Sequence, residues 1–246
     1  MPSALQSWSI IIFCYNEAGT IEKVVLEARS VMNEMAPGMY EIIIVDDGST
    51  DGSTEKIRAI EKNVPNIKAI FHPANLGIGS ALRSGYAQAT NQNICAIPAD
   101  GQFNVRELLP FRRIDEKTFV SFYRIENTTY SPFRNGLSYL NKKLNQIFIG
   151  VHLRDVNWVK VYKNKELQQL ELHLQSSLVE SEICAKLVAR DNQVIEVQSA
   201  YLPRTYGKSK GASFTTIFRA AKETWKLIVE IRKFAKRKSS PVGEIG

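Results

Sequence analysis

Cysteine is scarce in this sequence, and its pattern excludes two common uses of the residue. The 246 residues contain only Cys14, Cys95 and Cys184. An odd number with such wide spacing does not form a disulfide framework, and none of the three lies in a CxxC or Cys/His arrangement that binds zinc. We therefore expect three reduced thiols that serve as small apolar side chains.

Long hydrophobic runs are also absent. The longest, at residues 10–15 and 42–45, are far shorter than the roughly 18 residues needed to cross a bilayer. No apolar stretch follows Met1 in the manner of a signal peptide, so the sequence predicts a cytoplasmic protein. With 44% hydrophobic and 23% charged residues, the composition excludes a disordered or fibrous chain.

The formal net charge of +7 is concentrated near the C-terminus. Residues 211–246 contain eight Lys and Arg against three Asp and Glu, which leaves 24 bases against 22 acids, or +2, for residues 1–210. No nucleic-acid recognition module accompanies these bases, so we expect no nucleic-acid partner.

The segment 212–238 has the pattern of a basic amphipathic helix. Its apolar stripe includes Phe214, Ile217, Phe218, Ala221, Trp225 and Ile228. The pattern predicts either a peripheral contact with an anionic membrane surface or packing of the stripe on the body or on a second subunit. The second alternative allows a homo-oligomer.

The remainder alternates short β-branched runs with segments of helical period. Strands are predicted at residues 9–14, 41–46, 67–71, 94–98, 118–123, 156–162 and 194–198. Helices are predicted within 21–35 and 78–89 and at 133–148 and 177–189. This α/β pattern predicts a Rossmann-like, mostly parallel central sheet flanked by helices, in one domain over residues 1–210, with the amphipathic helix and tail at 211–246. Right-handed crossovers bring the carboxyl ends of the parallel strands to one edge, where a ligand would bind.

Three of the predicted strands end in acidic residues. Glu17 follows the first strand, Asp46 and Asp47 end the second, and Asp100 follows the fourth. Carboxylates that converge on one edge repel each other unless a cation or a donor-rich ligand lies between them. Asp100 and Gln102, after a buried strand, suit a hard divalent cation completed by a nucleotide diphosphate, and a solvated turn is the alternative.

The glycines at 77 and 79 do not make a dinucleotide-binding motif. Leu82 stands where the third glycine would be, and the segment follows the third strand rather than the first. These glycines instead indicate a backbone turn that approaches a ligand or a neighbouring element closely.

Five motifs in chain order resemble those of family 2 glycosyltransferases, above all the dolichyl- and polyprenyl-phosphate mannosyl- and glucosyltransferases. They are FCYNEAGTI, IIIVDDGSTDGS, NLGIGSALRSGYAQA, ADGQF and EVQSAYLPRTYGKSK. The resemblance implies a GT-A fold, a nucleotide-sugar donor, an Mg2+ or Mn2+ ion and inversion at the anomeric carbon.

The resemblance also implies roles for individual positions on the donor side. In the family, the residues that match Tyr15, Glu17, Asp46 and Asp47 hold the base and ribose. The residues that match Asp100 and Gln102 are ligands of the metal and diphosphate. Many relatives have a DxD pair where this chain has Pro98 followed by Ala99 and Asp100. We therefore expect a metal site with one carboxylate fewer.

On the acceptor side, the resemblance implies that basic residues bracket the acceptor phosphate and the donor diphosphate. The matching residues here are Arg124, Arg134, Arg204, Ser209 and Lys210. Arginine forks bind phosphate with two parallel hydrogen bonds, which suits this role, and surface charge is the alternative. Trp158, just after Asp155, stands where many relatives have small residues.

Two acids on the predicted helix 177–189 are candidates for a general base. Glu180 lies within the apolar face of that helix, whereas the resemblance favours Glu182. Such an acid could act as a base, bind a sugar hydroxyl or stabilise the positive end of the helix.

The chemistry of the acceptor decides whether a base is needed. A sugar hydroxyl must lose its proton as it attacks, whereas a lipid phosphate, with a second pKa of about 6, is already anionic at neutral pH. We therefore expect inverting transfer of a hexose from a UDP- or GDP-linked donor to a polyprenyl or dolichyl phosphate at the cytoplasmic membrane face, with catalytic candidates Asp100, Arg204, Glu180 and Glu182. The alternatives are a family 2 enzyme that acts on a saccharide hydroxyl and, because of Pro98, a catalytically silent nucleotide-sugar-binding subunit.

Overall fold

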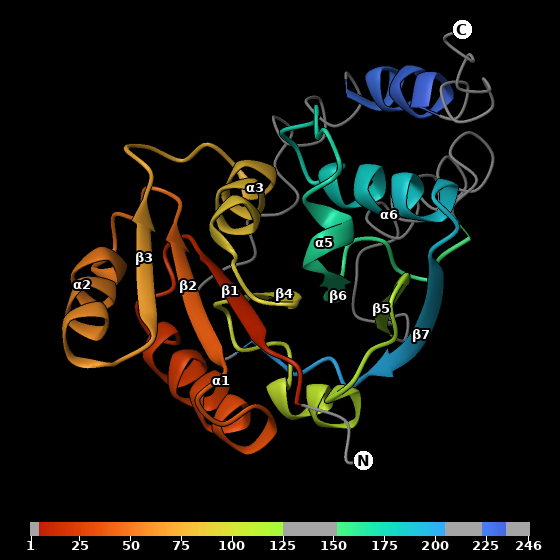
Figure 1. The fold of residues 1–246 in the computed structure, drawn as a ribbon. Coiled ribbons are helices and arrows are strands. Elements are labelled where there is room, and N and C mark those ends of the chain that lie inside the picture. The colour runs from red at the N-terminus through yellow and green to blue at the C-terminus, as the bar shows by residue number, and fades with distance from the viewer. Residues whose placement is uncertain (1–4, 125–151, 205–222, 235–246) are drawn as a thin grey trace, which may run out of the picture.

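The described part of the computed structural model, residues 5–124, 152–204 and 223–234, forms one central sheet with helices on both faces (Figure 1). The strand order is β3-β2-β1-β4-β6-β5-β7. The strands are β1 (Trp8–Cys14), β2 (Tyr40–Asp46), β3 (Ile67–Phe71), β4 (Asn93–Pro98), β5 (Thr118–Arg124), β6 (Lys160–Lys163) and β7 (Gln193–Ser199). The helices are α1 (Ile21–Met35), α2 (Ser53–Asn63), α3 (Ile78–Gln88), a 3-10 turn at Val105–Phe111, α5 (Asn164–Leu167), α6 (Val179–Ala189) and the helical residues 223–234.

The first four strands are parallel, as their composition predicts. β1 pairs with β2 on one side and with β4 on the other, and β2 pairs with β3. Their Ile and Val residues are buried on both faces of the sheet, which explains the continuous apolar runs. Because the chain steps from β1 through β2 to β3 and then returns to the far side of β1, the strand order reverses between β1 and β4. In sheets of this kind, ligands bind outside the carboxyl ends of the strands at such a reversal, and we call this region, beside the ends of β1 and β4, the crevice.

The structure differs from the prediction in both halves of the chain. The strand predicted at 156–162 is present only from Lys160 to Lys163, antiparallel to β4 and β5, and residues 156–158 form a turn. Helix α2 and the 3-10 turn were not predicted, because α2 buries only Ser53 and Ile57 and so lacks an apolar stripe. The helix predicted at 133–148 lies outside the described residues.

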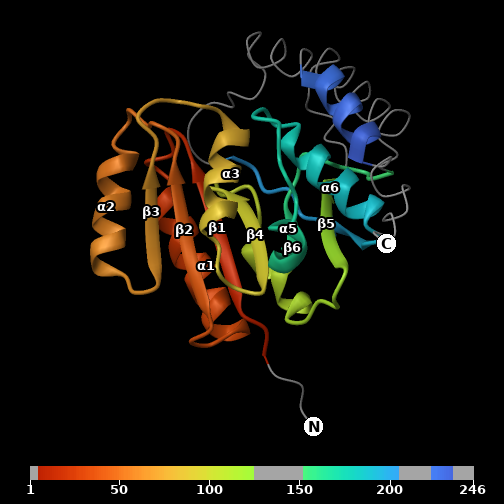
Figure 2. The same ribbon diagram turned by 45° about the horizontal axis from the view of Figure 1, so that its top comes forward.

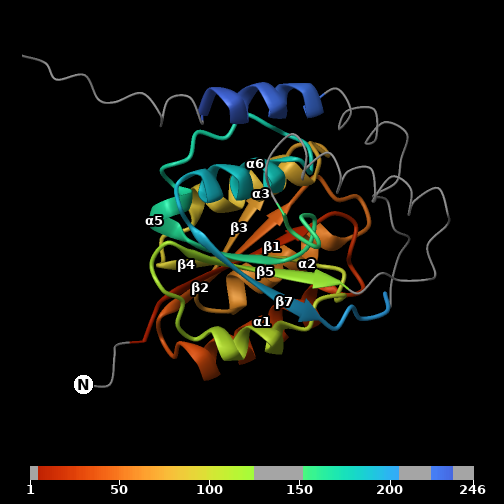
Figure 3. The ribbon, with the colours of Figure 1, turned by 90° about the vertical axis from the view of Figure 1, so that its right-hand side faces the viewer.

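Two apolar cores lie on opposite faces of the sheet (Figures 2 and 3). One joins the sheet to α1, α2 and the 3-10 turn. The other joins it to α3, α5, α6 and the helix at 223–234. Cys14, Cys95 and Cys184 are free and buried in these cores, which confirms their predicted role.

The helix at 223–234 packs on the body through one face. Leu227, Ile228 and Ile231 are buried there, and Glu223 accepts a hydrogen bond from the Ser176 N–H at 3.0 Å. Trp225, which the sequence pattern placed on the same stripe as Ile228, is 69% exposed. The predicted stripe is therefore wrong at this position, and its residues 214–221 lie outside the described chain. Among the described residues, no helix combines the length and the apolar character of a membrane span.

Candidate active site

The acidic ends of β1, β2 and β4 lie side by side at the crevice. The loops after β1 and β2 are interlocked by hydrogen bonds between their backbones and side chains. The Asn16 N–H donates to Ser49 Oγ at 2.8 Å, and the Thr50 N–H donates to Asn16 Oδ1 at 2.7 Å. Asp51 accepts the Ala18 N–H at 3.0 Å. These polar residues build the crevice floor, a role that turn propensity alone did not distinguish from solvated loops.

Asp46 and Asp47 are buried beneath this floor and bond to the chain itself. Asp46 accepts the Ser49 N–H at 3.1 Å through one oxygen and the Thr54 hydroxyl through the other. Asp47 accepts hydrogen bonds from the backbone N–H groups of Leu76 and Gly77, at 2.9 and 2.8 Å, and lies 2.7 Å from His72 Nδ1. Both carboxylates therefore fix the loops around the crevice. Tyr15, half-buried, begins the loop that faces them.

Asp100 and Gln102 stay together in a tight turn after β4. The Gln102 N–H donates to Asp100 Oδ1 at 3.0 Å, and the backbones of Gln102 and Leu202 are joined by a 3.0 Å hydrogen bond. Burial raises the pKa of Asp100 above its ordinary value, and the Gln102 N–H and the Arg124 guanidinium oppose that rise. Thr20, on the other side, donates its hydroxyl to the Ala99 carbonyl at 2.7 Å. The carboxylate is thus held at the crevice by both halves of the chain.

Arg204 joins the donor-side acids although it is 187 residues from Glu17 in sequence. Its guanidinium hydrogen-bonds Glu17 Oε1 and lies 3.6 Å from Asp100 Oδ2. Burial lowers the pKa of Arg204. The second oxygen of Glu17 is buried and has no hydrogen-bonding partner among the described residues. The structure therefore brings together three of the predicted site residues: Glu17, Asp100 and Arg204.

Arg124, at the end of β5, lies in a cage of its own and is close enough to Asp100 to lower the pKa of that carboxyl. Its Nε and Nη2 donate to the two oxygens of Asp155 at 2.7 and 3.3 Å. Its guanidinium carbon lies 4.5 Å from the Trp158 ring centre and 5.4 Å from that of Tyr201. Trp158, unexpected from the resemblance, thus forms one wall of the cage. Arg134, Ser209 and Lys210 lie outside the described residues.

The two candidate bases on α6 both point into the protein. Glu182 is fully buried, lies 2.6 Å from Lys186 Nζ and accepts the backbone N–H groups of His173 and Leu174. Glu180 is 7% exposed and accepts the hydroxyls of Tyr86 and Tyr162 at 2.6 Å each. Both carboxylates are therefore engaged inside the protein, and no sequence pattern indicated the two tyrosine partners.

The glycine at position 79 is explained by close packing rather than by phosphate binding. A Cβ at this position would lie 2.2 Å from the backbone oxygens of Gln175 and Ser176. The first turn of α3 therefore touches the chain before α6 directly. This contact ties the two halves of the fold together behind the crevice.

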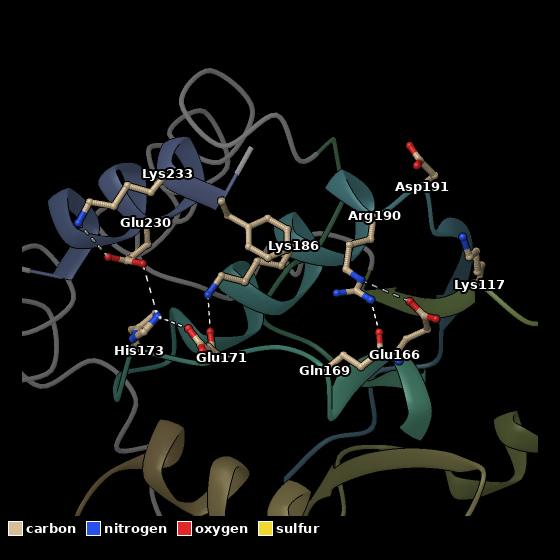
Figure 4. A pocket seen from close by; sticks show the side chains of 11 residues that line it. Lys117, Glu166, Gln169, Glu171, His173, Lys186, Arg190, Asp191, Glu230 and Lys233 are labelled. Carbon is tan, nitrogen blue, oxygen red and sulfur yellow. Dashed lines mark hydrogen bonds and ion pairs between the residues drawn. The ribbon is translucent and has the colours of Figure 1, made fainter. Parts of the chain in front are cut away.

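A separate pocket of about 520 Å³ lies between α6 and the helix at 223–234 (Figure 4). Its lining includes Lys117, which immediately precedes β5, whereas Arg124 ends that strand at the crevice. Several of its charges pair with one another, as Arg190 does with Glu166 and Lys233 with Glu230. The pocket is therefore distinct from the crevice.

A doubly wound sheet with carboxylates and arginines at its switch point is typical of a protein that binds a nucleotide or another phosphorylated ligand there. The comparison with protein families agrees: the profile described as Glycosyl transferase family 2 matches residues 9–162. The chain belongs to this family.

Relatives of known identity extend the comparison. An undecaprenyl-phosphate 4-deoxy-4-formamido-L-arabinose transferase from Aeromonas hydrophila subsp. hydrophila is 28% identical over 209 residues, which cover 82% of this chain and 62% of that protein. The chain thus spans less than two thirds of that relative's length.

Solved structures show the same fold. Glucosyl-3-phosphoglycerate synthase from Mycobacterium tuberculosis, crystallised with Mn2+, UDP and glucosyl-3-phosphoglycerate, has a TM-score of 0.62 at 18% identity over 92% of this chain and 80% of its own. TarS 1-349 from S. aureus, in complex with UDP-GlcNAc, has a TM-score of 0.63 at 15% identity over 92% of this chain and 66% of its own.

Proposed function

We propose that this protein transfers a hexose, with inversion, from a UDP- or GDP-linked donor to a polyprenyl phosphate. The observation that supports it most is the gathering of charged groups at this edge of the sheet: Glu17, Asp100 and Arg204 form one cluster, and the caged Arg124 acts electrostatically on Asp100. The curated relative acts, by its name, on undecaprenyl phosphate. An anionic acceptor needs orientation and charge neutralisation rather than a base, and arginines supply both.

A divalent cation fits the donor side of this site in part. Asp100 presents a carboxylate at the crevice, and the buried, unpartnered oxygen of Glu17 lies on the same cluster. Within the described chain, no group of three His, Cys, Asp or Glu side chains is placed to hold a metal ion. We therefore propose that Asp100, with Gln102 and the donor diphosphate, holds Mg2+ or Mn2+, which offsets the charge of the leaving diphosphate. The solved relative crystallised with Mn2+ and UDP supports this assignment.

The test is direct identification of the product. The protein is incubated with UDP- and GDP-hexoses, Mg2+ or Mn2+ and a short polyprenyl phosphate, and the lipid fraction is analysed by mass spectrometry and NMR. We expect a hexosyl phosphate lipid with inverted anomeric configuration. Transfer only to a saccharide hydroxyl would replace the proposed acceptor, and donor binding without turnover on any acceptor would indicate a silent binding subunit.

We also propose a peripheral contact with an anionic membrane, which would bring the protein to its lipid acceptor. The helix at 223–234 directs Trp225, Lys226, Arg232 and Lys233 outward, at helical spacing on one face, while its opposite face packs on the body. Each base near an anionic surface contributes about 1 kcal/mol.

Sedimentation with phosphatidylglycerol vesicles tests this contact. The triple variant Trp225→Ser/Lys226→Gln/Arg232→Gln should sediment less than the wild type. The variant Lys23→Gln/Leu26→Ser, which changes exposed residues on α1, is the matched control and should sediment normally. Equal sedimentation of the triple variant and the wild type would refute the contact.

A further inference from the structure

Lys160, the first residue of β6, carries its charge into the protein interior. Its side chain is 0% exposed. Its ammonium donates to the carbonyl oxygens of Val156 and Trp158, the latter at 2.9 Å, and lies 3.6 Å from Glu180 Oε2. The two carbonyls take two of the three N–H donors of the lysine, and the Glu180 carboxylate balances its charge at ion-pair distance. Lys160 is therefore a buried cation whose charge is balanced inside the protein.

Glu180 is held in place from two further elements. Tyr86 on α3 donates its hydroxyl to Oε1, and Tyr162 on β6 donates to Oε2, each at 2.6 Å. A general base must reach the proton it removes, and both oxygens of Glu180 are occupied within the protein. This arrangement suits an anion that balances a buried cation rather than one that meets a substrate.

The turn that Lys160 bonds is also the turn that holds Arg124. Asp155, immediately before it, chelates the guanidinium through two hydrogen bonds. Trp158, inside it, places its ring 4.5 Å below the guanidinium carbon and donates its Nε1–H to Ser199 Oγ at 3.1 Å. A shift of residues 155–158 would therefore move both walls of the Arg124 cage.

We propose that Lys160, balanced by Glu180, is a positioning residue that fixes the turn at 155–158 and thereby sets the orientation of Arg124. The acceptor phosphate enters only through the proposed function, on which the kinetic consequence rests. Misplacement of a binding group by about 1 Å lowers turnover up to about a hundredfold. Lys160 thus governs acceptor use from the interior without contacting the acceptor.

The test compares Lys160→Met with a matched control on the same strand. Lys163→Met also removes a buried lysine of β6, but Lys163 lies 3.8 Å from the exposed Glu116, away from the Arg124 cage. Both variants are measured alone and in an Arg124→Ala background for kcat/KM with short polyprenyl phosphate and for donor binding. Hydrogen–deuterium exchange of the 155–159 amides is recorded in the same proteins.

We expect Lys160→Met to lower kcat/KM for the acceptor by ten- to a hundredfold, with donor binding intact, and to lose this effect in the Arg124→Ala background, since coupled residues are not additive. Exchange at 155–159 should rise in Lys160→Met but not in Lys163→Met. An equal loss in both backgrounds, or unchanged exchange, would overturn the proposal.

If the wild type transfers no sugar to polyprenyl phosphate, the proposed function fails, and the exchange comparison still decides whether Lys160 holds the turn. If Lys160→Met does not fold, Glu180→Gln, which removes the balancing charge but keeps an acceptor for the tyrosines, takes its place under the same criteria.

Discussion

The buried pair of Glu182 and Lys186 offers a sharp test of whether Glu182 is a structural or a catalytic acid. The Nζ and Oε1 atoms lie 2.6 Å apart, and the two side chains are 2% and 0% exposed. Glu182→Gln removes the charge and leaves Lys186 uncompensated inside the protein. Breaking a buried pair in this way costs about 3–5 kcal/mol. For a chain of this size, that loss lowers the melting temperature by roughly 6–20 °C.

Urea unfolding and thermal melts measure this loss of stability, and two further variants serve as a control and a rescue. Glu34→Gln is the surface control, since Glu34 pairs with Arg106 and Arg112 at 3.3 and 3.1 Å but is 44% exposed, and it should change stability by no more than about 1 kcal/mol. Glu182→Gln/Lys186→Met removes both charges and should recover part of the loss. A Glu182→Gln protein no less stable than Glu34→Gln would refute the reasoning. Transfer activity in the stable double variant would show that Glu182 is not the base.

Three other predictions concern the crevice and its supports. Gly79→Ala should destabilise the protein by about 1–3 kcal/mol in urea unfolding, since its Cβ would meet backbone oxygens of Gln175 and Ser176 at 2.2 Å, and unchanged stability would contradict that contact. Burial raises the pKa of Asp100, so the ionised carboxylate destabilises the native state at neutral pH. Asp100→Asn should therefore raise the melting temperature at pH 7, and this gain should fade as the pH falls towards the ordinary pKa of 3.8. The same variant should lose the Mn2+-dependent stabilisation by UDP or GDP. Burial also raises the pKa of Cys14 to about 12, so this thiol should react with Ellman's reagent at pH 8 only after unfolding, and rapid labelling of the native protein would contradict its burial.

The sequence predicted the parallel half of the sheet because both faces of those strands are buried. Continuous apolar runs indicate the central strands β1 and β2, and these two strands, β4 and the edge strand β3 were all predicted to within one residue of their observed bounds. The alternating segment 156–162 was predicted as a strand over its whole length, and this was wrong for its first half. There, Lys160 donates to the carbonyls of Val156 and Trp158 and the Asp155 side chain accepts the Asn157 N–H, so the backbone turns instead of extending. Local propensity does not reveal these hydrogen bonds.

Without the family resemblance, the site could be predicted only where its residues follow strands. Glu17 and Asp100 follow parallel strands, so topology alone brings them to one edge. Arg204 reaches the same edge through the loop after β7, a contact across most of the chain that no short-range pattern encodes. Glu180 and Glu182 are two residues apart on α6, and helical periodicity and the family resemblance favoured different members of this pair. Their partners, two tyrosines for one and a lysine for the other, become visible only in the packed structure.

This burial changes how the acceptor question can be answered. A comparison of Glu180→Gln/Glu182→Gln with the wild type would distinguish the two acceptors if either acid were an accessible base, since a hydroxyl acceptor needs a base and a phosphate does not. In the structure, the double change uncouples Lys160 and Lys186, two buried lysines, from their carboxylates. Lost turnover would then follow from a loosened Arg124 cage or a destabilised α6 under either acceptor chemistry. The acceptor must instead be identified from the linkage in the product. A sugar linked to a phosphate and a sugar linked to a hydroxyl oxygen are different compounds, and this difference does not depend on the stability of the enzyme.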